Sequence, residues 1–159
     1  MAARYIQKAV DSLHATINAG IATQLRAVET SESLTTNALT DPVDVVKARL
    51  PMDNRTPLIQ VFEETWSHDT KAGQRHSIIT TFCNVVLTTL STDVDLEAAE
   101  LFMRRYVTAM IETIAADPTL GGSAMSAIIT GGDSAAAVGD QSASRLAHVL
   151  EVEVRTSTP

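Results

Sequence analysis

The segment of this sequence that most restricts the fold is an amphipathic helix with strand-like segments on both sides. Its apolar residues recur at three- and four-residue steps, as on one face of a helix. Asp93 or Asp95 can cap its start, Asp117 with Pro118 ends it, and a Gly-Gly pair follows at 121–122. The expected buried stripe consists of Leu96, Ala99, Phe102 or Met103, Tyr106, Met110 and Ile114.

A second helix is expected at the N-terminus, over residues 1–28. It spans about six turns, and its apolar stripe consists of Ile6, Val10, Leu13, Ile17, Ile21, Leu25 and Val28. Residues 29–56 are polar and predict a long loop. Within this loop, Asp41 followed by Pro42 is typical of a helix start, so we expect one short helix that ends before Pro51.

Four segments have the composition of strands. Residues 58–66 and 78–90 are rich in β-branched and aromatic residues, and the polar stretch 67–76 between them predicts an antiparallel hairpin. Residues 124–130 predict a short strand, and 131–143 a loop of small residues. The last strand, 144–155, alternates apolar residues with polar ones at Glu151, Glu153 and Arg155; its apolar face consists of Leu146, His148, Leu150, Val152 and Val154.

Together these elements predict an α+β fold in one domain spanning residues 1–159. We expect a mixed, mostly antiparallel sheet of about four strands, with the long N-terminal helix and the second helix packed on one face. The sheet-and-helix core would span residues 57–155, and residues 156–159 would form a tail. The strand 78–90 has large apolar residues on both faces, so it is expected to be central or covered on both sides.

Composition excludes several classes of protein. The 12 Lys and Arg against 19 Asp and Glu give a net charge of -7, and no basic cluster is present to neutralise a nucleic-acid backbone. A single cysteine allows no internal disulfide. No signal peptide is recognisable, and no apolar run approaches the ~18 residues of a membrane helix. We therefore expect a protein made in a cytoplasm, without a membrane partner.

The sequence motifs predict no catalytic residue, metal site or cofactor, and we therefore expect that the protein is not an enzyme. The four histidines lack zinc-ligand spacing, and Glu63 and Glu64, as neighbours on a strand, would point to opposite faces. No phosphate-binding loop or nucleophile elbow occurs. One turn is flanked by His68, Asp69 and His76. We favour the interpretation that these side chains are solvated over the interpretation that they bind a metal ion. We expect Cys83 to be a buried inert thiol, His148 a core histidine, and Trp66 part of the core.

The order of these elements between residues 57 and 155 resembles the tail terminator, or tail completion, proteins of long-tailed bacteriophages. The resemblance rests on the hairpin, the helix from Leu101 to its stop at 117–122, the short strand, the loop and the closing Leu-Glu-Val-Glu-Val strand. It implies a ring, usually of six subunits, that caps the tail tube and ends its polymerisation. It further implies contacts with the major tail tube protein and the head-completion or connector protein, and a place in the virion at the tail–head junction.

In such a ring, genomic DNA passes through the lumen without sequence-specific binding. We expect surplus acidic residues to face this channel, and the loops 67–76 and 131–143 to meet neighbouring subunits or partners. The candidate interface residues are His68, Asp69, Lys71, Arg75, His76, Asp133, Asp140 and Gln141. The alternatives are a neck or head-completion protein, which would join head and tail one layer away, and an α+β binding module unrelated to phages.

Overall fold

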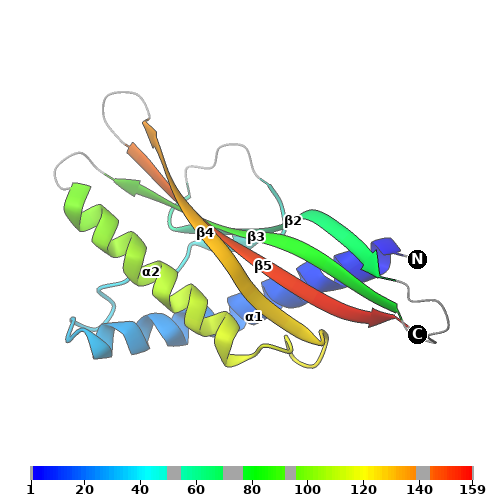
Figure 1. Cartoon of the computed structure of the whole chain (residues 1–159). Coiled ribbons are helices and arrows are strands. Elements are labelled where there is room, and N and C mark those ends of the chain that lie inside the picture. The colour runs from blue at the N-terminus through cyan, green and yellow to red at the C-terminus, as the bar shows by residue number, and fades with distance from the viewer. Residues whose placement is uncertain (1, 50–54, 70–76, 92–95, 139–143, 159) are drawn as a thin grey trace.

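The sheet at the centre of this protein has five strands in the order β1-β2-β3-β5-β4 (Figure 1). The structure, a computed structural model, describes residues 2–49, 55–69, 77–91, 96–138 and 144–158. The elements in chain order are α1 (Ala2–Ser31), β1 (Asp44–Val46), β2 (Leu58–Asp69), β3 (Ser77–Ser91), α2 (Leu96–Ala116), β4 (Ser126–Val138) and β5 (Ser144–Thr158).

Both helices lie on one face of the sheet, which confirms the predicted α+β class with five strands in place of four (Figure 1). All strand pairs are antiparallel except β1 with β2. The core lies between the helices and the sheet. It contains the predicted stripe of α1 from Val10 to Val28 and, from α2, Met103, Tyr106, Met110 and Ile114.

The predicted short helix after Pro42 is wrong, because this segment forms the strand β1. Val45 pairs with Ile59 of β2 and is buried in the core. Val45 and Val46 are β-branched, and such residues fit a pleated strand better than a helix. The imidazole Nε2 of His14, on α1, lies 2.8 Å from the carbonyl oxygen of Val45 and ties the strand to the helix.

The predicted loop 131–143 is wrong for residues 131–138, which belong to β4; residues 139–143 lie outside the described part of the chain. β4 pairs with β5 along its length, with a register shift between Ile129 and Gly131. Gly and Ala have low strand propensity, but the neighbouring strand supplies a continuous ladder of partners that overrides it.

The predicted C-terminal tail is also wrong in its described part, because β5 continues to Thr158. Thr156 and Thr158 extend the buried alternation of Val152 and Val154, and both are buried. Threonine is polar but β-branched, so it can extend a strand into the core where its hydroxyl finds a partner. The Thr158 hydroxyl lies 2.5 Å from that of Ser77 on β3.

Trp66 is 47% exposed, which contradicts its expected place in the core. β1 pairs only with Leu58, Ile59 and Gln60, so the rest of β2 forms an edge of the sheet. A register shift between Glu63 and Thr65 also interrupts the regular alternation there. Side chains beyond the shift therefore lie at an edge strand, where solvent reaches them.

Candidate functional site: the open face of the sheet

The face of the sheet that the helices leave uncovered is a surface to which several strands contribute. On β3, odd-numbered residues from Ile79 to Thr89 are buried, and the even-numbered residues between them are partly exposed. Strand pairing carries this alternation across the sheet: Phe82 pairs with Glu153, Asn84 with Glu151, and Val86 with Val149. The open face therefore presents Phe62, Glu64, Thr80, Phe82, Asn84, Val86, Ile128, Val149, Glu151, Glu153 and Arg155.

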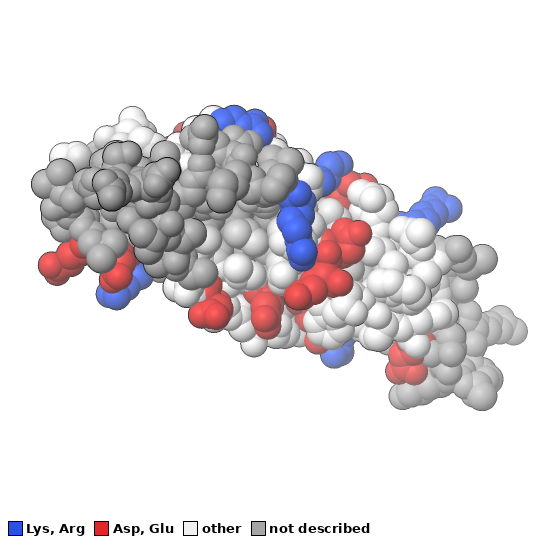
Figure 2. Space-filling view, turned by 90° about the horizontal axis from the view of Figure 1, so that it is seen from above, with Lys and Arg blue, Asp and Glu red and all other residues white. Residues whose placement is uncertain are grey.

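Among the described residues of this open face, carboxylates outnumber basic groups. The basic groups are Arg155 and Arg49, whose guanidinium carbon lies 4.7 Å from the centroid of the Phe62 ring. Glu151 and Glu153 stand two residues apart on β5, about 7 Å along the strand. Glu64 accepts a hydrogen bond of 3.1 Å from the Asn84 amide, and Arg155 donates one of 2.6 Å to Glu153. In the view from above, acidic side chains form a broken band, and Lys and Arg side chains stand beside it (Figure 2).

The described carboxylates, histidines and cysteine form no group of three or more that could hold a metal ion. Cys83 faces the helices and is buried, as predicted. Burial, with a smaller contribution from the nearby Glu63 carboxylate, raises the pKa of its thiol to about 12. A thiol with such a pKa is not a nucleophile at neutral pH.

A serine–histidine pair joins β4 and β5 on the helix side of the sheet. The Ser134 hydroxyl lies 2.7 Å from Nδ1 of His148, and the Asp133 carboxylate accepts a hydrogen bond from the Ser134 backbone. His148 is partly exposed, in contrast to the core position expected for it, because its neighbours on edge strand β4, Gly132 and Ser134, are small. Among the described residues no carboxylate bonds the imidazole, so the pair lacks the orienting group of a catalytic triad.

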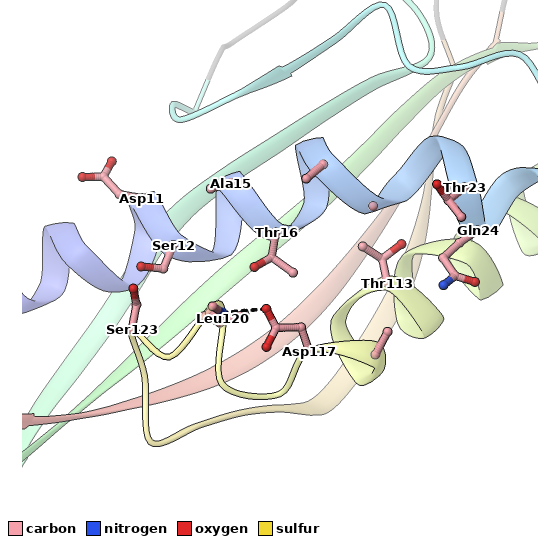
Figure 3. A pocket seen from close by; sticks show the side chains of 14 residues that line it. Asp11, Ser12, Ala15, Thr16, Thr23, Gln24, Thr113, Asp117, Leu120 and Ser123 are labelled. Carbon is pink, nitrogen blue, oxygen red and sulfur yellow. Dashed lines mark hydrogen bonds between the residues drawn. The ribbon is translucent and has the colours of Figure 1, made fainter.

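A groove of about 650 Å³ lies between α1, α2 and the turn that follows α2 (Figure 3). Small and hydroxyl side chains line it, with the carboxylates of Asp11 and Asp117. Asp117 accepts hydrogen bonds from the Gly121 backbone at 2.6 Å and the Thr119 hydroxyl at 3.0 Å. Hydrogen bonds from Lys47 and then Gln7 lower the pKa of Asp11. Small apolar groups and hydroxyls thus make up most of the groove, and its two carboxylates are already engaged, Asp11 with Lys47 and Asp117 with the turn.

Three of the predicted interface residues, His68, Asp69 and Asp133, belong to the described part of the chain, and they do not lie together. His68 and Asp69 lie at the end of β2, where Nε2 of His68 is 2.8 Å from the Ser77 hydroxyl. Asp133 lies on β4, and β3 and β5 separate it from them. The predicted residues Lys71, Arg75, His76, Asp140 and Gln141 lie outside the described residues.

Sequence reasoning did not select Glu64 and Trp66 as surface residues. The alternation of the last strand predicts Glu151 and Glu153 on its polar face, and their pairing with Asn84 and Phe82 on the open face confirms this. No helix among the described residues has the length and apolar character that a bilayer crossing requires. No family model matches this chain, and no curated protein matches its sequence.

Proposed function

We propose that this chain is a structural subunit of a ring that caps a bacteriophage tail tube, ends its polymerisation and joins it to the head connector. The order of helices and strands supports this function through the family resemblance. The observation that carries it is the open face of the sheet, where, among the described residues, carboxylates outnumber basic groups and form no catalytic cluster.

In this proposal the open face lines the lumen and the helices face outward. DNA in the lumen presents a continuous array of phosphates, and carboxylates on the wall repel them. A wall with a predominance of basic groups would bind the backbone and slow the passage of DNA. Glu64, Glu151 and Glu153 project from two strands of one face, so each subunit would contribute a small acidic patch to the ring.

The test is an assembly reaction with the major tail tube protein of the same phage. Tubes polymerised alone should grow without a fixed limit, whereas tubes formed with this chain should stop growing and carry extra density at one end in electron micrographs. A matched control omits the chain and adds the same concentration of an unrelated acidic protein. Tubes of unchanged length, with no density at either end, would contradict the proposal.

A neck or head-completion protein is the nearest alternative, and the same experiment separates the two. Such a protein would bind the connector and leave tube length unchanged.

The groove between α1 and α2 favours a second alternative, a binding module for a small polar ligand, because hydroxyl groups line a volume large enough for one. A chain that stays monomeric with tubes present and is stabilised against heat by a small ligand would favour this module.

A further inference from the structure

We propose that copies of this chain join edge to edge, with β4 of one copy pairing antiparallel with β2 of the next, so that the sheet continues from subunit to subunit. The inference deepens the proposed ring, on which it rests, by naming the surfaces that meet. It concerns two segments: the β4 edge segment, residues 129–138, and the β2 edge segment, residues 61–69.

Both edge segments have a side that no strand among the described residues covers. β1 covers only Leu58, Ile59 and Gln60 of β2, and the turn after α2 covers only the start of β4, where the Ala127 amide donates to the Pro118 carbonyl oxygen at 2.7 Å. Among the described residues, no backbone hydrogen bond from another element reaches the outer side of either segment. The unpaired amides and carbonyls of such an edge are a template for another strand.

The β4 edge segment lacks most devices that protect natural edges. Residues 129–138 contain no Lys, Arg or Pro and a single charged residue, Asp133. The segment is ten residues long, and the β2 edge segment is nine. An edge of this length that is left unprotected is expected to be covered in the assembled state, and the other edge of the same sheet has a matching length.

Strand direction fits a second copy as the occupant. β2 is antiparallel to β3, β3 to β5, and β5 to β4, so β4 runs opposite to β2. A neighbour placed side by side without inversion therefore brings β2 against β4 in antiparallel orientation. Two different edges meet in such a contact, which is the heterologous interface from which rings are built.

Strand register fixes how the two segments would meet. Gly132 pairs with Leu150, Leu150 with Val85, and Val85 with Val61, so Gly132 and Val61 lie at one height in the sheet. Full overlap with matching faces requires the neighbour to be displaced by about six residues along the strands. A displacement of four residues, or ~14 Å, still pairs the β2 edge segment with the β4 edge segment at every position except Asp69. Sheets that close on themselves show a stagger of this kind.

This displacement places the exposed Trp66 of one copy opposite Gly132 of the next. Both residues belong to the helix side of the sheet, because Trp66 pairs with the buried Thr81 and Gly132 with the buried Leu150. A Cβ atom at position 132 would lie 3.1 Å from the Val149 carbonyl oxygen, which is a tight contact, so glycine fits this position best. An aromatic ring across the strands from a glycine covers the exposed backbone there and stabilises the pair.

A pair of cysteines tests the contact. At the four-residue displacement, Thr65 and Asp133 lie opposite each other on the open face, since they pair with Phe82 and Val149 respectively. Within one copy β3 and β5 separate them by three strand spacings, about 14 Å, which is too far for a disulfide. Mild oxidation of the Thr65→Cys/Asp133→Cys variant of the isolated chain at high concentration should give a ladder of covalent multimers on a non-reducing gel.

Three controls make the result specific. Each variant with one added cysteine should stay monomeric, since the native Cys83 is buried, and a mixture of the two should give dimers only. The Thr65→Cys/Ser134→Cys variant, whose thiols would face opposite sides of the sheet, should not form multimers. Absence of multimers from the Thr65→Cys/Asp133→Cys variant would overturn the proposal, as would dimers formed equally well by a single variant, since these indicate a two-fold contact.

Trp66 is the only tryptophan and reports the same contact without crosslinking. Its fluorescence emission should move to shorter wavelength as concentration rises, and Trp66→Ser should weaken self-association at least tenfold while thermal unfolding of the monomer changes little. An emission maximum that stays constant over the range of concentration in which copies associate would count against the contact.

Multimers that leave tube length unchanged would contradict the proposed function alone, and capped tubes without multimers would contradict the edge contact alone.

Discussion

Glu29 is a buried carboxylate that holds the turn after α1 in place. It accepts hydrogen bonds from the backbone amides of Asn37 at 3.1 Å and Leu39 at 2.7 Å. The Arg26 guanidinium lies 3.4 Å from the same carboxylate and also pairs with Asp41 at 3.1 Å. A charge in the interior is tolerated only where such partners surround it, so this cluster depends on each of its members.

We predict that Glu29→Gln lowers the free energy of unfolding by about 2 kcal/mol, because the amide loses one acceptor and leaves Arg26 with less neutralising charge. Urea titration followed by circular dichroism would measure the change. The control is Glu112→Gln, which removes an exposed carboxylate from α2 and should change stability by less than about 0.5 kcal/mol. Equal effects of the two variants would show that the cluster contributes nothing specific.

His148 should make stability depend on pH. Burial lowers its pKa below the ordinary value of 6.5, against a smaller opposing effect of Asp133. The folded chain thus favours the neutral imidazole, and protonation favours the unfolded chain. The contribution of His148 is complete above pH 6.5 and is lost as the pH falls through that value towards the lower folded pKa.

The pH effect is measured by urea titrations at pH 7.5 and 5.5. His148→Gln retains a hydrogen-bonding group for Ser134 but does not titrate, so it should lose less stability on acidification than the unmodified chain. Comparing the two chains removes the contributions of the other titrating groups. A difference of the opposite sign would mean that the imidazolium is stabilised in the folded state, and the assignment of burial as the dominant cause would be wrong.

At the scale of elements, α1 and α2 pack closely where Gly20 faces Thr113. A Cβ at position 20 would lie 2.9 Å from Cγ2 of Thr113, which is closer than packed carbons lie. The Thr113 hydroxyl donates to the Ala109 carbonyl oxygen at 2.7 Å, so the rotamer is held and its methyl group points at α1. The glycine weakens α1 as a helix but permits this crossing.

A pair of substitutions separates these two effects. Gly20→Ala alone should destabilise the fold by about 1 kcal/mol, because overpacking outweighs the gain in helix propensity. In a Thr113→Ser background, which keeps the hydroxyl and removes the methyl group, the same substitution should become neutral or stabilising by up to about 1 kcal/mol. Thermal unfolding of the four chains would measure the coupling, and additive effects would show that the methyl group does not limit the helix approach.

The long elements could be predicted from the sequence because each carries its periodicity over many residues. The stripe from Val10 to Val28 and the alternation from Leu146 to Val154 are of this kind. β1 could not be predicted, because a three-residue strand has too few positions to show a period. Its conformation is decided by pairing with β2. The same holds for the Gly- and Ala-rich part of β4, where β5 imposes the strand that local propensity opposes.

At the scale of the whole molecule, the proposed lumen surface predicts an effect on DNA passage. Neutralising Glu64, Glu151 and Glu153 together by Gln should slow DNA ejection, because the wall then repels the phosphates less. Virions carrying the variant would be compared in an ejection assay at low ionic strength, where screening is weakest. The matched control neutralises Glu97, Glu100 and Glu112 of α2, with the same change of charge on the helix side.

Unchanged ejection by virions whose rings form normally would contradict the open face as the lumen wall, and so would equal slowing by the control set.

The sequence predicted the surplus of carboxylates but not their common face across strands. Strand order and register decide that placement: β5, the last strand in the chain, lies between β3 and β4 and aligns Glu151 with Asn84. No local pattern in the sequence contains that order.

The insertion of β5 between β3 and β4 also has a consequence for synthesis on the ribosome. While residues up to 138 emerge, β4 has no strand to pair with, and β3 keeps one side open, since β5 is the partner of both. Translation at about 5–20 residues per second leaves these strands unpaired for a second or more. A nascent chain therefore cannot present the completed sheet to a neighbour, so the order of the strands delays assembly until β5 has been made.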